Sequence, residues 1–255
     1  MTGQVVLYSK EGSTAIITVN RPELRNPLNS GVFQMLDTVL DDVASDEEVR
    51  VLLVSGAGNS FVSGADINEL LAYSTQEGWL ASRFQQSVFN KLERIRRPSI
   101  AVIDGFAMGG GLELALSCTF RIASTKARLG FPELGLGIIP AFGGTERLVR
   151  TVGLAKASEL ILFRTILSGE EAHSIGLIHQ VAEPDELLVR AKEWAKNLAS
   201  LSPVAVHLEL ELLLNAAGQG LDAALALESG LASLAVSSPE AKELLNRFLS
   251  KDVKK

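Results

Sequence analysis

The sequence of 255 residues predicts an α/β core followed by a helical carboxy-terminal region. In the first half, short β-branched stretches alternate with stretches whose apolar residues recur at helical spacing, as in α/β proteins. From Pro184 onward, the apolar residues recur at helical spacing only. We therefore expect an α/β core over residues 1–183 and a helical region over residues 184–255.

The elements of the core follow in order from local signals. Two short strands, at residues 5–9 and 14–19, flank Glu11-Gly12, which predicts a hairpin turn. Ser30 is the expected N-cap of the first helix, because helical apolar spacing begins directly after it. The elements expected next are a buried strand at 51–54, helices at 66–73 and 84–95, and a strand at 99–103.

The helical region is expected to begin with an amphipathic helix at residues 187–198. Further helices are expected at 204–214, 221–236 and 239–249. These last helices carry many apolar residues, which fit packing on another subunit and packing on the chain's own core equally well.

Composition and charge exclude several classes of function. The net charge is −6, so the surface does not favour binding to nucleic-acid phosphates. The single Cys118 excludes a disulfide framework and a cysteine zinc site, and three histidines are too few and too scattered for a metal centre. No apolar run reaches the roughly 20 residues of a spanning helix, and the first residues lack the pattern of a signal peptide. We therefore expect a cytoplasmic protein with neither a nucleic-acid nor a membrane partner.

Well-known nucleotide-binding and nucleophile motifs do not account for the sequence. It contains neither a P-loop nor the G-x-S-x-G elbow of serine hydrolases. Residues 52–58 imitate a dinucleotide-binding fingerprint, but Phe61 stands where the third glycine is required. Cys118 is interpreted as a buried filler rather than a nucleophile.

The stretch that carries chemistry most directly is residues 104–116. Three successive glycines, Gly109 to Gly111, follow a predicted strand and open an apolar helix. They leave backbone N–H groups uncovered at a helix amino end, which suits an anion or a carbonyl oxygen that gains negative charge. Glu113 lies one turn into this helix among apolar residues, so partial desolvation is expected to raise its pKa and suit it to acid–base work.

Two further segments complete the candidate site. Glu133 follows Pro132 in a stretch of apolar and glycine residues at 127–140. Taken alone, Glu133 is better interpreted as a cap or a solvated loop residue, but two carboxylates in glycine-rich apolar settings favour joint acid–base catalysis. The loop at 59–67 runs into another helix and can supply a second N–H donor beside the first.

At these residues the sequence resembles the crotonase family, also called the enoyl-CoA hydratase/isomerase family. The resemblance covers nearly the whole chain and keeps the family's segment order. The matching segments are Ser63-Gly64-Ala65-Asp66-Ile67, Gly109-Gly110-Gly111-Leu112-Glu113-Leu114-Ala115, and Pro132-Glu133 followed by Gly137-Ile138-Ile139-Pro140 and Gly143-Gly144-Thr145.

The resemblance implies a spiral of ββα units with a helical trimerisation region, assembled as a trimer or as a homohexameric dimer of trimers. It implies an acyl-CoA thioester substrate and no metal or redox cofactor. The N–H groups of Ala65 and Gly110 would hold the thioester oxygen. Glu113 would activate the water that attacks the β-carbon, and Glu133 would deliver a proton to the α-carbon. Further substrate or CoA contacts are expected from Ser63, Gly64, Asp66, Ile67, Gly109, Pro140, Arg25 and Lys251.

The sequence departs from the family pattern at several positions. Ala141 and Phe142 follow Pro140, where relatives often have glycine, so the pocket for the acyl chain is expected to be unusual. The resemblance also leaves open an isomerase that shifts the double bond with Glu133 as its main acid–base group, and a member that only binds or scaffolds. Retention of Glu113 favours the hydratase, and which acyl chain it accepts stays open.

Overall fold

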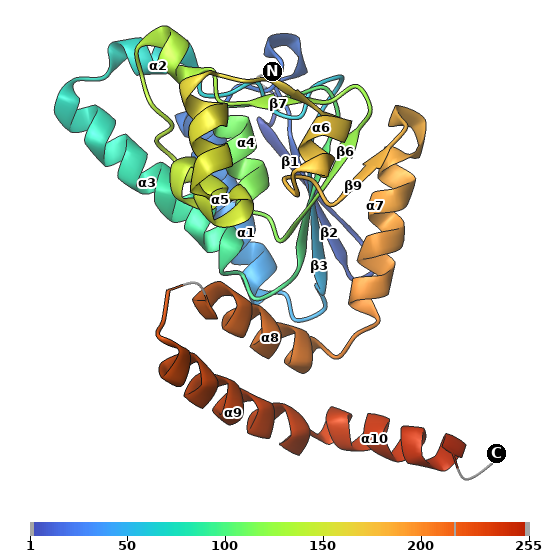
Figure 1. Cartoon of the computed structure of the whole chain (residues 1–255). Helices are drawn as coiled ribbons and strands as arrows, with labels where there is room; N and C mark the ends of the chain where they lie inside the picture. The colour runs from blue at the N-terminus through green and yellow to red at the C-terminus, as the bar shows by residue number, and fades with distance from the viewer. Residues whose placement is uncertain (1–2, 217, 253–255) are drawn as a thin grey trace.

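The computed structural model describes residues 3–216 and 218–252, except the side chains of 251 and 252. Its core is a six-stranded sheet in the order β1-β2-β3-β4-β6-β9 (Figure 1). β1 and β2 form an antiparallel hairpin, and every other neighbouring pair in this sheet is parallel. The strands are β1 (Val6–Glu11), β2 (Thr14–Val19), β3 (Val51–Gly56), β4 (Ser99–Ile103), β6 (Phe120–Ser124) and β9 (Gln180–Ala182).

The central strands are buried on both faces, as their continuous apolar runs predict. In β3, Leu52 and Val54 join the larger hydrophobic cluster, while Val51 and Leu53 join a second cluster on the opposite face. The larger cluster is covered by α1 (Ser30–Ser45), α3 (Thr75–Glu93), α4 (Gly110–Leu116) and α5 (Gly144–Leu162). The second is covered by α7 (Pro184–Ala199). The expected α/β core is therefore present, with helices on both faces of its sheet.

A smaller three-stranded sheet places the glycine-rich segments. It consists of β5 (Phe106–Met108), β7 (Arg128–Gly130) and β8 (Leu167–Ser168). Because β5 and β7 run parallel, α4 and the 3₁₀ helix η2 (Glu133–Leu136) leave this sheet at the same end. The remaining short elements are η1 (Pro22–Leu24), α2 (Ile67–Ala72) and α6 (Gly169–Ser174).

Two expected helix starts are wrong, for local reasons. The N-cap of α1 is Asn29 rather than Ser30, since the Asn29 side chain accepts a hydrogen bond from Val32 N. Helix α3 begins at Thr75, nine residues before the expected start at 84. A capping box between Ser74 and Glu77 starts it, and its first turns expose most of their side chains, so no apolar repeat marks them.

The last three helices leave the core. α8 (Pro203–Ala216), α9 (Leu221–Ser237) and α10 (Pro239–Asp252) extend away from the sheet in Figure 1. α8 and α9 pack on each other and bury none of their residues. Among the described residues, no single helix has the length and apolarity to cross a membrane, and two bent helix pairs pass that test only when joined.

Candidate active site

One cavity brings the four expected catalytic positions together. Its volume is about 440 Å³, and its lining includes Ala65, Gly110, Glu113 and Glu133. These residues come from the loop before α2, from the first turn of α4 and from η2, which are separate segments of the sequence. The rest of the lining is mostly apolar: Leu70, Tyr73, Ser74, Thr75, Gly78, Ile138, Ile139, Ala141 and Phe142.

A second cavity adjoins the first on the side of the 63–67 loop. Its volume is about 390 Å³, and it shares Ala65, Leu70, Glu133 and Ile138 with the first. Seven of the residues expected from the sequence line this second cavity: Ser63, Gly64, Ala65, Asp66, Ile67, Gly109 and Glu133. The two cavities together can hold an extended ligand whose middle lies between Ala65 and Glu133.

The backbone N–H of Ala65 is free because of how its loop pairs. Leu28 forms a parallel bridge with Ala65. Leu28 N donates to Gly64 O, and Asp66 N donates to Leu28 O, both at 2.8 Å. In a parallel ladder, the residue between two such contacts turns its own N–H to the other side. The Ala65 N–H accordingly donates to no described acceptor, and Ala65 lines both cavities.

The N–H of Gly110 donates to no acceptor in the described part of the chain, because Gly110 is the first residue of α4. A helix cannot satisfy the N–H groups of its first turn, and the N-cap residue Gly109 has no side chain to reach them. Gly109 has φ 48°, which favours glycine, and a Cβ there would lie 2.3 Å from Glu133 Oε1. The glycine therefore lets a free N–H donor and the Glu133 carboxylate share one small space.

Glu113 is held firmly by one of its two carboxylate oxygens. Its Oε1 accepts hydrogen bonds from Phe142 N at 2.8 Å and from Gly144 N at 2.7 Å. Burial raises the pKa of Glu113, and these two N–H donors oppose that rise, with smaller contributions from the backbone of Ala141 and the charge of Arg147. Oε2 accepts no hydrogen bond from a described side chain or backbone group, so it is the oxygen available to a ligand.

Glu133 lies in a different environment. It is 9% exposed, and its Oε2 is buried without a hydrogen-bond partner among the described residues. Burial, with a smaller contribution from the charge of Glu113, raises the pKa of Glu133 to about 7. The two carboxyl groups therefore differ in their support, since backbone donors stabilise the charge of Glu113 while Glu133 is suited to carry a proton near neutral pH.

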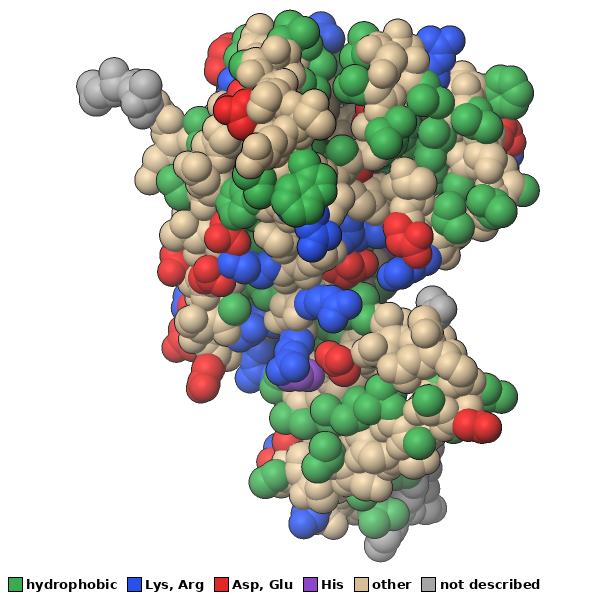
Figure 2. Space-filling model, turned by 90° about the vertical axis from the view of Figure 1, so that its left-hand side faces the viewer, with side chains coloured by type: hydrophobic (Ala, Val, Ile, Leu, Met, Phe, Trp, Pro, Cys, Tyr) green, Lys and Arg blue, Asp and Glu red, His purple; other side chains and the backbone are tan. Residues whose placement is uncertain are grey.

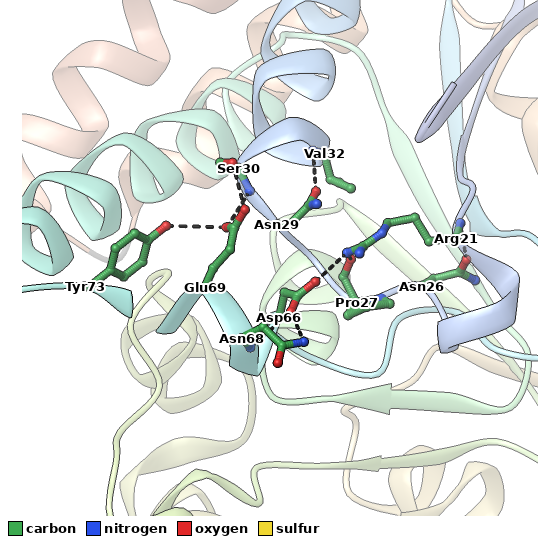
Figure 3. A network of polar contacts seen from close by, with 10 residues as sticks. All are labelled: Arg21, Asn26, Pro27, Asn29, Ser30, Val32, Asp66, Asn68, Glu69 and Tyr73. Atoms are coloured by element: carbon green, nitrogen blue, oxygen red, sulfur yellow. Dashed lines mark hydrogen bonds and ion pairs between the residues drawn. The ribbon is translucent and has the colours of Figure 1, made fainter. Parts of the chain in front are cut away.

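A polar network fixes the loop that carries Ala65 (Figure 3). Arg21 Nη1 donates to Asp66 Oδ2 at 2.9 Å and to Pro27 O at 2.8 Å, and both side chains of this ion pair are largely buried. Asp66 Oδ1 accepts from Asn68 N and caps α2. One turn further, Glu69 accepts from the backbone N and the hydroxyl of Ser30. Asp66 thus has intramolecular partners for both oxygens.

Three expected ligand contacts lie elsewhere or beyond the described residues. Arg25 is exposed and belongs to neither cavity lining; its guanidinium lies 5.1 Å from the centroid of the Phe106 ring. Pro140 is partly buried and also lies outside both linings. The side chain of Lys251 lies outside the described residues.

Sequence reasoning missed the groups that hold Glu113 and the loop. The N–H donors of Phe142 and Gly144 leave no side-chain signature, although the unusual Phe142 marks the segment. Its ring packs against Phe33 and Phe89, at centroid distances of 5.2 and 6.0 Å. Arg21 was missed although it is a charged residue beside a proline in the loop that ends β2.

Comparisons with known proteins agree on one family. The family model described as "Enoyl-CoA hydratase/isomerase" matches residues 9–254. The chain is similar to the short-chain-enoyl-CoA hydratase of Clostridium acetobutylicum, with 42% identity covering 96% of this chain and 95% of that protein. It is 36% identical to the crotonyl-CoA hydratase of Syntrophomonas wolfei, covering 98% and 97%. The solved structure of an enoyl-CoA hydratase from Bacillus anthracis superposes with a TM-score of 0.93 at 32% identity, covering 97% of each chain.

Proposed function

The chain belongs to the enoyl-CoA hydratase/isomerase family, and on that premise we propose how its residues carry out the reaction. The protein is an enzyme with the crotonase fold that hydrates enoyl-CoA thioesters. The observation that carries the residue assignment is the single cavity in which two free backbone N–H groups and two carboxyl groups meet. Hydration is redox-neutral, so the proposal requires no cofactor beyond the coenzyme A of the substrate.

The N–H groups of Ala65 and Gly110 bind the thioester oxygen. When water adds to the β-carbon, electrons move to this oxygen and the thioester acquires enolate character. Two backbone donors already directed at that position stabilise the new charge without rearrangement, and one such donor contributes about 2.7–4 kcal/mol. Both donors belong to rigid segments, because Leu28 pairs with the first loop and α4 carries the second.

Glu113 acts as the base and Glu133 as the acid. Oε2 of Glu113 takes a proton from the attacking water while the N–H donors of Phe142 and Gly144 keep Oε1 in place. Glu133 gives its proton to the α-carbon, a step that suits a carboxyl group whose pKa is raised to about 7 by burial. In the reverse dehydration the two residues exchange roles, because each then starts in the opposite protonation state.

We propose a short acyl chain and a path for the CoA moiety. The relatives at 42% and 36% identity are named for short-chain-enoyl-CoA and crotonyl-CoA. The aromatic rings of Tyr73 and Phe142 line the cavity beyond Gly110, which supports a compact acyl group there. The adjoining cavity, lined by residues 63–67, would receive the pantetheine arm.

We also propose that the protein assembles as a trimer or a dimer of trimers through its carboxy-terminal helices. Figure 2 shows hydrophobic side chains gathered on the lower, helical part of the molecule. Large apolar side chains of α8 and α9 are exposed there, among them Leu213, Leu221, Leu225, Leu234 and Val236. Burying such a surface against other copies would stabilise these helices, and analytical ultracentrifugation at several concentrations tests the assembly.

Substitution of the carboxyl groups tests the assignment of roles. Glu113→Gln keeps the size of the side chain but removes its basicity, so hydration of crotonyl-CoA should fall by about 10²–10⁴-fold. The loss of ultraviolet absorbance of the conjugated thioester measures the rate, and binding of a saturated acyl-CoA should change little. Near-normal hydration by this variant would show that Glu113 is not the base.

A further inference from the structure

Helix α3 presents a polar stripe to the loop that holds Glu113. Ser82, Gln86, Asn90 and Glu93 are spaced by four, four and three residues, so they lie on one face of the helix. The segment 141–144, which leads into α5, packs along this face. The stripe has no role in the site as described above. Two of its members donate hydrogen bonds to this segment, and the other two accept hydrogen bonds from Arg147, which in turn donates to the segment.

The first two members, Ser82 and Gln86, donate hydrogen bonds to the same carbonyl oxygen. Ser82 Oγ donates to Ala141 O at 2.8 Å, and Gln86 Nε2 donates to the same oxygen at 2.9 Å. The C=O of Ala141 and the N–H of Phe142 belong to one planar peptide unit. That N–H is a donor to Glu113 Oε1. A single rigid peptide thus connects two α3 side chains to the catalytic carboxylate.

The last two members act through Arg147. The Arg147 Nη2 atom donates to Asn90 Oδ1 at 2.6 Å and to Glu93 Oε2 at 2.9 Å. Its Nη1 donates to Phe142 O at 3.2 Å, so the next peptide of the loop is also held. Arg147 itself is 5% exposed, and removing it would leave the partly buried carboxylate of Glu93 without its partner, so it is a poor first target for substitution.

We propose that Ser82 and Gln86 are positioning residues of the hydratase, which fix the peptide between Ala141 and Phe142 so that its N–H stays directed at Glu113. The proposal rests on the role of Glu113 assigned above. Hydrogen bonds to the carbonyl of a peptide also polarise its N–H and strengthen it as a donor. The stripe therefore stabilises the charged form of Glu113 without touching the substrate.

The direction of the pH effect follows from the charges that face Glu113. Arg147 from α5 favours the ionised carboxylate, and Glu133 from η2 disfavours it when it is itself ionised. Neither group is changed by substituting Ser82 or Gln86. Weakening the donor peptide then raises the pKa of Glu113, so the acid limb of the kcat/KM profile moves to higher pH.

The test is the double variant Ser82→Ala/Gln86→Met, which keeps side-chain bulk at position 86 but removes both donors. We expect kcat for crotonyl-CoA to fall about tenfold and the acid limb to rise by about one pH unit, which corresponds to the loss of part of one charge-assisted hydrogen bond. KM should change less than about twofold, because neither residue touches the substrate. The conservative variant Ser82→Thr keeps a hydroxyl at this position, so much of the kcat that the alanine variant loses should be recovered with threonine.

Ser87→Ala is the matched control on the same helix. The Ser87 hydroxyl is exposed and donates to Phe84 O within α3, so this variant should behave like the wild type. A double variant with an unshifted pH profile, whatever its kcat, would show that the stripe only packs the helix on the loop and would overturn the proposal. If Glu113→Gln retained full activity, the assigned role of Glu113 would fail instead, which separates the two questions.

Discussion

Replacing Glu133 with glutamine should make the protein more stable and less active, and the gain in stability should grow with pH. Burial raises the pKa of Glu133 from 4.5 to about 7 in the folded chain. Between these values the folded state keeps a proton that the unfolded chain has released. Stability is therefore lost as the pH rises through this window, and above about pH 7 the full penalty of burying the charge is present.

The size of the effect follows from the shift. A rise from 4.5 to about 7 corresponds to at most about 3.4 kcal/mol in the free energy of unfolding. Glu133 borders a cavity, so solvent screens its charge, and about 1–2 kcal/mol is the expected remainder. Glutamine carries no charge at any pH, and its amide fits the same space.

Chemical or thermal unfolding at pH 5 and pH 8 measures the difference. Glu133→Gln should exceed the wild type by about 1–2 kcal/mol at pH 8 and by much less at pH 5, where most of the wild-type carboxyl is protonated. Glu47→Gln, at an exposed position, is the control for removing one negative charge. An equal difference between Glu133→Gln and wild type at both pH values would refute the assignment of a raised pKa.

Two further predictions concern the chemistry itself. The hydration rate should decline as the pH rises above about 7, because Glu133 must carry the proton that it delivers. The variant Glu133→Gln should lose about 10²–10⁴-fold of the rate, and its pH profile should no longer show this alkaline decline. An alkaline decline that persists in the variant would assign it to another group. Gly110→Pro removes the N–H at the first helical position, where proline is tolerated, and should lower kcat about 10²–10³-fold. Gly110→Ala is its control, since both variants place a Cβ 2.7 Å from the Phe142 ring but only alanine keeps the donor, so equal losses in the two variants would show crowding rather than loss of the oxyanion contact.

The parts of the site that the sequence predicts are those formed by residues close together in the sequence. The glycines at 109–111 and Glu113 are neighbours on α4, so their joint position follows from the helix itself. The 63–67 loop likewise leads directly into α2. That Glu133 lies beside Gly109 needs β5 and β7 to pair in parallel, which no local signal in either strand specifies.

The parts that were missed depend on contacts over long distances in the sequence. Phe142 N reaches Glu113 across 29 residues, and Gln86 reaches Ala141 across 55. Every residue except proline carries a backbone N–H, so the sequence does not reveal which N–H groups donate to Glu113. The polar stripe on α3 was also missed, because the expected helix began at residue 84 and the exposed first turns of α3 carry no apolar repeat.

The two glutamates are assigned opposite tasks because of backbone geometry rather than their own chemistry. Glu113 lies deeper, at 1% exposure, and burial raises its pKa above the usual value of a glutamate. Two N–H donors at Oε1 and the nearby Arg147 counter that effect. Glu133 is less buried but lacks such donors, and its Oε2 has no partner among the described residues. In the proposed mechanism one carboxyl group takes a proton and the other gives one, and the N–H donors of the loop at 141–144 are the support that distinguishes Glu113 from Glu133.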